Sequence, residues 1–161
     1  MILRPDYINA ITPFIDAPLV KILAGVRRCG KSTIFEMLVQ EIKNKGVSPD
    51  NIIERKYNNP DYDDFTAKKM YTDLKDAIKE KGRCYLFLDE LQEISGWEKT
   101  VNSLMEDFDV DIYVTGSNSK LMSSEISTYL TGRYVLIPVY TLSFKEYLTF
   151  KNKDITKARE A

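Results

Sequence analysis

Histidine is absent from the 161 residues of this sequence, and cysteine is scarce. Without histidine, the chain cannot build a Ser-His-Asp or Cys-His triad or a metal site with histidine ligands. Its two cysteines, Cys29 and Cys84, are too few for a disulfide framework and are typical of a protein from a reducing compartment. We therefore expect a cytoplasmic protein without disulfide bonds.

Long apolar runs and a strong net charge are also lacking. No run of about 18 apolar residues occurs, which argues against a membrane span, and residues 1–6 do not look like the start of a secretion signal. The net charge of -1 gives no electrostatic case for nucleic-acid binding by the chain as a whole and leaves only local basic patches. Hydrophobic residues make up 43% of the sequence and charged residues 29%, so we expect one globular domain with a substantial core.

The most informative stretch is Gly25–Thr33, which reads GVRRCGKST. It fits the phosphate-binding pattern G-x-x-x-x-G-K-S/T. The apolar residues 19–24 before it predict a buried strand, and residues 32–45 after it predict an amphipathic helix. A chance match would be an ordinary glycine-containing turn, but a loop between a strand and a helix N-terminus is the context that supports the motif. We therefore expect nucleotide binding here.

Each residue type in this loop has a physical reason. Gly25 and Gly30 can adopt a positive φ and lack a Cβ atom, so backbone N–H groups can surround phosphate oxygens. The helix that follows adds its own N–H groups and the positive end of its dipole. Lys31 would reach the β- and γ-phosphates, Ser32 would offer its hydroxyl to Mg²⁺, and Thr33 would support the α-phosphate. The predicted nucleotide-binding residues are Gly25, Val26, Arg27, Arg28, Cys29, Gly30, Lys31, Ser32 and Thr33.

Strands and helices alternate along the rest of the chain. The predicted helices lie at residues 6–15, from the loop at 58–64 to about 81, after a capping box at 95–98, around 121–130, and from a second capping box at 143–146 to about 150. The predicted strands lie at 52–57, near a sheet edge, and at 84–88, 111–115 and 134–140. This alternation predicts an α/β fold, with a parallel sheet covered by helices on both faces. Ligands bind at the carboxyl ends of the strands in such sheets.

Two further polar sites directly follow predicted strands. Asp89 stands at the tip of an apolar strand, where a carboxylate can hold Mg²⁺, and Glu90 beside it can accept a proton from an attacking water. Taken alone, Asp89 would be an N-cap or turn residue and Glu90 a solvated loop carboxylate, but beside the phosphate loop we favour metal binding and catalysis. Ser117 or Asn118 could contact the γ-phosphate or orient the water, although turn chemistry explains a Gly-Ser-Asn-Ser loop nearly as well.

Several arginine and tyrosine residues have two interpretations each. Arg133, directly before the last predicted strand, is either an arginine finger for a neighbouring subunit or a surface salt-bridge residue. Arg27 and Arg28 are expected to face solvent or a partner rather than to act in catalysis. Tyr57 and Tyr62 are candidates to flank a nucleotide base.

Together these segments resemble a family of bacterial and archaeal AAA-type P-loop ATPases. The resemblance covers roughly residues 7–150, and the Gly-Val-Arg-Arg form of the loop is specific in combination with the Leu-Ser-Phe-Lys-Glu-Tyr ending. The segments that carry it are FIDAPLVK at 14–21, GVRRCGKST at 25–33, LFLDELQEI at 86–94, VTGSNS at 114–119, LTGRY at 130–134 and LSFKEYL at 142–148.

The resemblance implies ATP as the nucleotide and a three-layer α/β/α P-loop NTPase fold with a five-stranded parallel sheet of the AAA type. It makes Asp89 and Glu90 the Walker B pair, puts a sensor at Ser117 or Asn118, and favours Arg133 as a finger within a homo-oligomer. Members of the family usually continue with a winged helical region and a C-terminal domain similar to restriction nucleases, through which DNA could be a partner. We therefore expect an ATPase domain at residues 1–150 and a charged tail at 151–161 that leads to such a region.

The function predicted from the sequence is a Mg²⁺-dependent ATPase that couples hydrolysis to a conformational change, in a DNA-related or defence context. The alternative is a regulatory nucleotide switch with negligible turnover. A small-molecule kinase fits poorly, because Asp89 and Glu90 suit water activation and no arginine-rich lid follows. The predicted catalytic residues are Lys31, Glu90, Ser117, Asn118 and Arg133, and the predicted metal ligands are Ser32 and Asp89.

Overall fold

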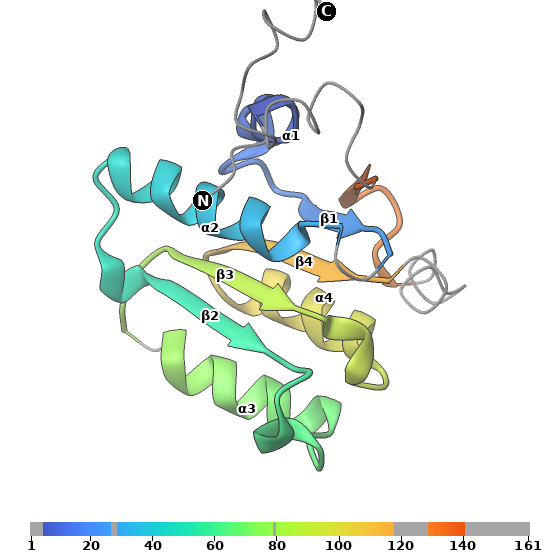
Figure 1. Ribbon diagram of the computed structural model, residues 1–161. Coiled ribbons are helices and arrows are strands. Elements are labelled where there is room, and N and C mark those ends of the chain that lie inside the picture. The colour runs from blue at the N-terminus through green and yellow to red at the C-terminus, as the bar shows by residue number, and fades with distance from the viewer. Residues whose placement is uncertain (1–4, 27–28, 79, 118–128, 141–161) are drawn as a thin grey trace, which may run out of the picture.

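The centre of the protein is a sheet of five strands, seen in a computed structural model that describes residues 5–26, 29–78, 80–117 and 129–140. In chain order the strands are β1 (Val20–Ala24), β2 (Ile52–Lys56), β3 (Cys84–Asp89), β4 (Val110–Gly116) and β5 (Tyr134–Pro138). Their order in the sheet is β2-β3-β4-β1-β5, and every neighbouring pair is parallel (Figure 1). The predicted five-stranded parallel sheet is therefore confirmed, and β2 lies at a sheet edge as its polar sequence predicted.

Helices cover both faces of this sheet. They are α1 (Pro5–Ile11), α2 (Lys31–Asn44), α3 (Ala67–Ile78) and α4 (Trp97–Asp107), with short 3₁₀ turns at Thr12–Phe14, Pro49–Asn51, Pro60–Tyr62 and Leu91–Glu93. One buried core lies between the sheet and α1 and α2, and the other lies between the sheet and α3 and α4. This is the predicted three-layer α/β/α arrangement.

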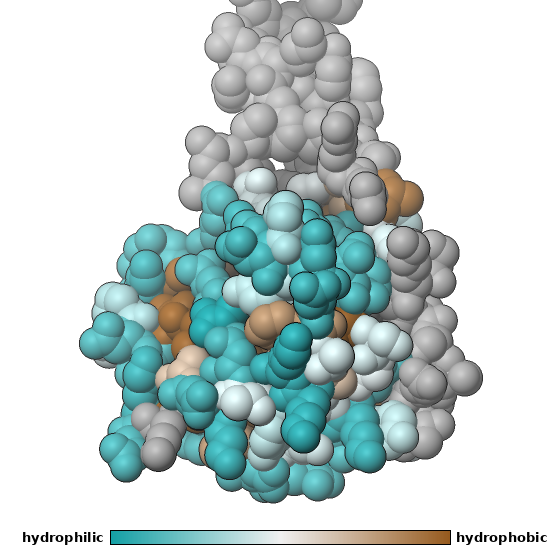
Figure 2. All heavy atoms as spheres, turned by 90° about the horizontal axis from the view of Figure 1, so that it is seen from below, coloured by the Kyte–Doolittle hydropathy of each residue, from teal (hydrophilic) through white to brown (hydrophobic). Residues whose placement is uncertain are grey.

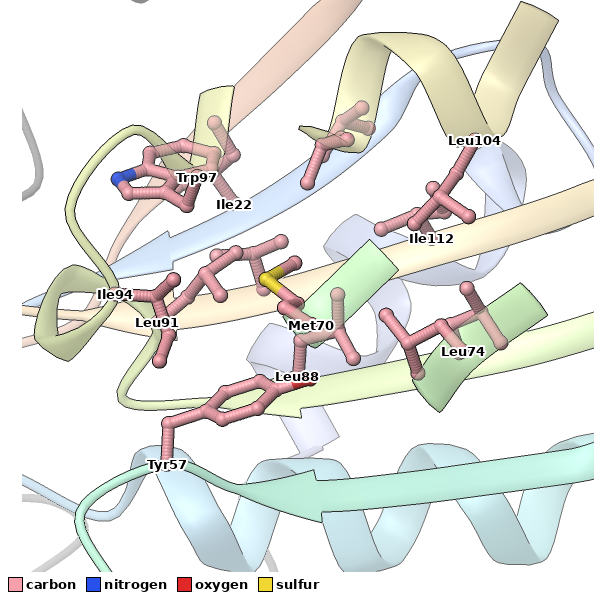
Figure 3. Packing of buried hydrophobic residues seen from close by; sticks show 14 of the residues in the cluster. Ile22, Tyr57, Met70, Leu74, Leu88, Leu91, Ile94, Trp97, Leu104 and Ile112 are labelled. Atoms are coloured by element: carbon pink, nitrogen blue, oxygen red, sulfur yellow. The ribbon is translucent and has the colours of Figure 1, made fainter. Parts of the chain in front are cut away.

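The two cores follow from the alternation of side chains along the central strands. In β3, Cys84, Leu86 and Leu88 join the core under α3 and α4, whereas Tyr85 and Phe87 join the core under α1 and α2. All six residues of β3 are buried because both faces are covered, which is why the strand reads as a nearly continuous apolar run. Figure 3 shows side chains of α3 and α4 packed against the strands in the first of these cores.

Two predicted helix boundaries are wrong, each for a local reason. Ser95 does not cap α4, because Gly96 is the N-cap residue, with a left-handed φ of 80° and no side-chain capping hydrogen bond. The predicted helix at 6–15 is interrupted after Ile11, where a 3₁₀ turn that contains Pro13 begins. Proline lacks the N–H group that would continue an α-helix.

Smaller differences concern the ends of other elements. The helix predicted to reach residue 81 ends at Ile78, and the strand predicted to reach residue 140 ends at Pro138. Most of the predicted helix at 121–130 and the whole of the predicted capping box and helix at 143–150 lie outside the described residues.

Tyr57 lies in the core under α3 rather than beside a nucleotide base. Its side chain is only 2% exposed, and its ring centroid lies 5.1 Å from that of Tyr62 and 6.4 Å from that of Phe65. Tyr57 directly follows β2 and continues the strand face of Ile53, which belongs to the same core. In Figure 3 its ring points toward Met70 and Leu88. The prediction that Tyr57 flanks a base is therefore wrong.

The buried hydroxyl of Tyr57 leads to a stability prediction. Within the part of the chain that the structure describes, this oxygen has no hydrogen-bond partner, and burial of an unpaired polar group costs about 1–3 kcal/mol. We expect Tyr57→Phe to raise the free energy of unfolding by about 1 kcal/mol in urea denaturation. Tyr113→Phe is the matched control and should lower it, because the Tyr113 hydroxyl donates to Asp111. Destabilisation by Tyr57→Phe would contradict this account.

The outer surface is mostly hydrophilic in the view from below, with separate smaller apolar areas (Figure 2). Among the helices of the described residues, none combines the length and the apolar composition that a membrane span needs. Both cysteines are buried and neither forms a disulfide, as predicted.

Candidate functional site

The glycine-rich loop lies where β1 ends and α2 begins, as predicted. Gly30 is the N-cap residue of α2 and has a φ of 98°, which favours glycine over residues with a side chain. Gly25 does not have the left-handed φ that we allowed for, but its lack of a Cβ atom is required. A Cβ atom on Gly25 would lie 2.3 Å from the carbonyl oxygen of Val139 and 2.8 Å from Sγ of Cys29.

Arg27 and Arg28 lie outside the described residues.

Lys31 opens α2 and points its ammonium group back over this loop. Its side chain is almost completely buried, with 4% exposure. Nζ donates hydrogen bonds to the carbonyl oxygens of Gly25 at 2.7 Å and Val26 at 3.0 Å, and it lies 3.9 Å from Sγ of Cys29. The loop therefore holds a positive charge beside the N-terminus of α2, and the two together form a site that suits an anion.

Ser32 and Asp89 meet beside Lys31, although they are 57 residues apart in the sequence. The Ser32 hydroxyl donates a hydrogen bond of 3.0 Å to Oδ2 of Asp89. Asp89 ends β3 on the strand face that carries Phe87, which is the face covered by α2. A hydroxyl and a carboxylate are oxygen ligands of the kind that Mg²⁺ prefers, so these two residues fit the predicted metal site.

Glu90 follows directly and lines a small cavity together with residues of the loop. The cavity has a volume of about 210 Å³ and is lined by Glu90 and by Gly30, Lys31, Ser32 and Thr33. The backbone of Glu90 is left-handed, with φ at 54°, and its Oε2 accepts a hydrogen bond of 2.6 Å from Nε2 of Gln92. The structure thus brings the predicted phosphate loop and the predicted carboxylate pair together.

Thr115 is a residue of this site that the sequence interpretation missed. It is completely buried near the end of β4. Its hydroxyl donates to Oδ1 of Asp89 and accepts a hydrogen bond of 2.9 Å from the backbone N–H of Glu90. Leu88 is paired with Val114 in the sheet, so the next residue of each strand comes side by side. The register of β3 and β4 could have identified Thr115 as a neighbour of Asp89, whereas no sequence pattern indicated Gln92.

Of the two candidate sensor residues, the structure describes Ser117 but not Asn118. Ser117 is half-buried and follows Gly116, whose carbonyl accepts a hydrogen bond of 3.1 Å from the N–H of Gly25. Asn118 lies outside the described residues. Ser117 is therefore next to a residue that contacts the phosphate loop, and the choice between Ser117 and Asn118 stays a prediction.

The structure places Arg133 at the amino-terminal end of the strands, whereas the phosphate loop lies at their carboxyl-terminal end. Its carbonyl accepts a hydrogen bond of 2.8 Å from the N–H of Val20, at the start of β1, whereas the loop follows Ala24 at the end of β1. Its guanidinium donates to Oδ1 of Asn102 and lies 3.8 Å from Oε1 of Glu106 on α4. These are the surface contacts that the sequence left open as the alternative. A role as an arginine finger requires a neighbouring copy of the chain.

A second cluster of polar residues lies at the amino-terminal end of β1 and β4. Lys21 and Asp111 form a buried ion pair, with each residue 1% exposed. Nζ of Lys21 also donates to the carbonyl of Ala17 at 2.8 Å, while Oδ2 of Asp111 accepts from the Tyr113 hydroxyl at 2.7 Å and from the Asp16 N–H at 3.0 Å. Burial lowers the pKa of Lys21, and the Asp111 carboxylate opposes that shift. The pair is thus surrounded by hydrogen bonds on both sides.

Asp16 connects this cluster to the partly exposed Arg83, because its N–H donates to Asp111 and its carboxylate accepts from Arg83. Burial alone would raise the pKa of the Asp16 carboxyl group, but hydrogen bonds from Tyr85 and Arg83 outweigh it and leave the pKa lowered. Burial and the hydrogen bond to Asp16 raise the pKa of Tyr85 to about 12. At neutral pH, Asp16 is therefore charged and Tyr85 is a neutral donor.

Comparisons with known proteins agree with this fold. The family model described as "AAA domain" matches residues 17–148. The chain is 38% identical over 159 residues to an uncharacterized protein of Haemophilus influenzae, covering 96% of this chain and 39% of that protein. It is 35% identical over 139 residues to an uncharacterized protein of Methanocaldococcus jannaschii, covering 86% and 30%. The chain therefore spans well under half of these curated relatives.

Solved structures share the fold at low sequence identity. A DNA polymerase III gamma subunit-related protein from Thermotoga maritima has a TM-score of 0.61 at 10% identity, covering 95% of this chain and 51% of that chain. The replication initiator DnaA bound to AMPPCP and single-stranded DNA has a TM-score of 0.55 at 17% identity, covering 99% and 56%. At such identities the similarity extends to the fold.

Proposed function

Because the chain belongs to the family of AAA domains, we propose that it is a Mg²⁺-dependent ATPase domain whose nucleotide state is coupled to a conformational change. The observation that carries this proposal is the contact between Ser32 and Asp89 beside the buried Lys31. Oγ of Ser32 lies 3.0 Å from Oδ2 of Asp89. These residues come from two separate segments and converge at one end of the sheet. An isolated glycine turn before a helix would not need such a partner.

The roles follow from the chemistry of the side chains. The Lys31 ammonium and the N–H groups at the start of α2 bind the phosphates of ATP. The Ser32 hydroxyl and the Asp89 carboxylate would hold Mg²⁺, which neutralises phosphate charge when it is bound. Glu90 faces the same cavity and accepts a proton from the attacking water. Ser117 or Asn118 orients the water or the γ-phosphate.

A regulatory switch with little turnover is the second candidate, and the position of Glu90 favours it. One carboxylate oxygen of Glu90 is already engaged by Gln92 at 2.6 Å. An oxygen that already accepts this hydrogen bond has one lone pair fewer for the O–H group of an attacking water. We propose that turnover, if any, increases in a homo-oligomer, where Arg133 of one copy reaches the site of the next. DNA is a proposed partner of the longer proteins, in a DNA-related or defence context.

Phosphate release from ATP, measured with the purified chain in Mg²⁺ and in EDTA, separates these two candidates. The ATPase proposal predicts steady phosphate release that requires Mg²⁺. The switch predicts tight ATP binding with release no faster than the rate in protein-free buffer. A chain that binds no ATP under either condition would contradict both.

Lys31→Ala should weaken ATP binding by about 100-fold, because it removes charge-assisted hydrogen bonds worth about 1.5–3 kcal/mol each. Isothermal titration calorimetry with ATP measures the change. Lys43→Ala is the matched control, since Lys43 is an exposed residue in the last turn of the same helix. Equal loss of affinity in both variants would mean that general positive charge, rather than the loop, attracts the nucleotide.

A further inference from the structure

Thr115 lies on a strand face where three alternate residues of β4 are polar or aromatic. Asp111, Tyr113 and Thr115 all point toward the α1 and α2 layer, since residues two apart share a face. Asp111 belongs to the buried ion pair, and Tyr113 stacks on Phe87 with 4.5 Å between ring centroids. Thr115 is the residue of this row that reaches the carboxylate pair. Its side chain is 0% exposed, so its hydroxyl needs partners inside the protein.

The direction of both hydrogen bonds at Thr115 is fixed by chemistry. A backbone N–H can only donate, so the Thr115 hydroxyl oxygen must accept from Glu90. The single hydroxyl proton is therefore available for Oδ1 of Asp89. Oδ2, the other oxygen of Asp89, is the one that faces the Ser32 hydroxyl at 3.0 Å. Thr115 thus determines which oxygen of Asp89 is turned toward the predicted metal site.

The same hydroxyl also restrains Glu90. A left-handed backbone in a residue other than glycine costs about 1 kcal/mol or more, and Glu90 adopts it with φ at 54°. The hydrogen bond from the Glu90 N–H to Thr115 helps to hold this conformation, from which the side chain reaches the cavity beside Lys31. One hydroxyl therefore fixes the two carboxylate residues relative to each other.

We propose that Thr115 is a positioning residue, which orients Asp89 toward the Mg²⁺ site and Glu90 toward the attacking water. This inference rests on the proposed ATPase function. Among the described residues, the Thr115 hydroxyl bonds Asp89 and Glu90 rather than the phosphate loop, so it acts through these two residues. Valine has nearly the same shape as threonine, so Thr115→Val removes both hydrogen bonds with little change in packed volume. Thr115→Ser keeps the hydroxyl and removes only a methyl group.

The test compares the wild type with Thr115→Val and Thr115→Ser. Loss of such a supporting contact typically lowers metal affinity or activity by about 10- to 100-fold. We expect Thr115→Val to lower kcat by this factor and to raise the Mg²⁺ concentration that gives half-maximal rate, with the KM for ATP little changed. Thr115→Ser should recover most of the lost kcat. Urea denaturation checks that each variant is folded under the assay conditions.

The possible failures can be distinguished. Wild-type kcat and Mg²⁺ dependence in folded Thr115→Val would overturn the role of Thr115 while the ATPase proposal stands. An equal loss in Thr115→Ser and Thr115→Val would also overturn it, because packing rather than the hydroxyl would then matter. If the wild type binds ATP without turnover, the ATPase proposal fails, and the Thr115 proposal is judged by binding. It then requires that Mg²⁺ strengthen ATP binding to the wild type more than to Thr115→Val. If no ATP binds, both proposals fail.

Discussion

Glu90→Gln should lower kcat for ATP hydrolysis by about 10²- to 10⁴-fold, the usual contribution of a general base, and should leave the Kd for ATP close to that of the wild type. Glutamine has nearly the shape of glutamate but cannot accept the proton of the attacking water. Glu90 follows β3 and is not part of the phosphate loop, although it lines the same cavity, so we expect ATP binding to depend little on its charge. Phosphate release under single-turnover conditions and calorimetry with ATP measure the two effects separately.

Glu93→Gln is the control for this variant. It makes the same chemical change at the end of the 3₁₀ turn that Glu90 precedes, but the side chain of Glu93 is exposed. We expect Glu93→Gln to hydrolyse ATP as the wild type does. If Glu90→Gln retains wild-type kcat, another group accepts the proton and Glu90 has been assigned wrongly. Loss of ATP binding in Glu90→Gln would instead indicate that the change disturbs the loop.

Lys21→Met should destabilise the protein by about 3–5 kcal/mol, because it leaves the buried carboxylate of Asp111 without its cation. The double variant Lys21→Met with Asp111→Asn should recover a large part of this loss. Asparagine keeps an oxygen that can accept from the Tyr113 hydroxyl and from the Asp16 N–H, and it carries no charge. Urea denaturation followed by circular dichroism gives the free energies of unfolding for the double-mutant cycle.

Arg55→Met provides the contrasting control. Arg55 also pairs with an aspartate, Asp73, at 2.8 Å, but these side chains are 24% and 31% exposed. Removal of an ion pair near the surface costs only about 0.2–1 kcal/mol. Equal destabilisation by Lys21→Met and Arg55→Met would show that burial of the Lys21–Asp111 pair does not carry the predicted penalty.

The parts of the structure that the sequence predicted well depend on local patterns. The apolar runs of β3 and β4 and the glycine-rich loop needed no knowledge of distant residues, and their strand-loop-helix context is confirmed. The capping box at Ser95 failed because the left-handed backbone of Gly96 makes Gly96 itself the N-cap residue of α4. The sequence predicted that Gly25 needs to lack a Cβ atom but not which group requires it, because the close carbonyl belongs to Val139, which is distant in the sequence.

Thr115, Gln92 and Arg133 show what lay beyond local patterns. Thr115 reaches Asp89 only through the register of β3 and β4, and Gln92 reaches Glu90 through the geometry of a short 3₁₀ turn. The position of Arg133 did follow from the predicted topology. In a parallel sheet, a residue before β5 lies at the opposite end of the strands from a loop that follows β1. The predicted alternation therefore contained that information, although the residues left the role of Arg133 open and only the family resemblance favoured a finger.

The most direct test of the central claim is an ATP titration of the wild type and of Asp89→Asn, each with Mg²⁺ and with EDTA. We predict that Mg²⁺ strengthens ATP binding to the wild type and has little effect on Asp89→Asn, because Asp89 and Ser32 would hold the metal beside the phosphate loop. Failure of the wild type to bind ATP would contradict the account. The same Mg²⁺ dependence in both proteins would contradict the metal site at Asp89.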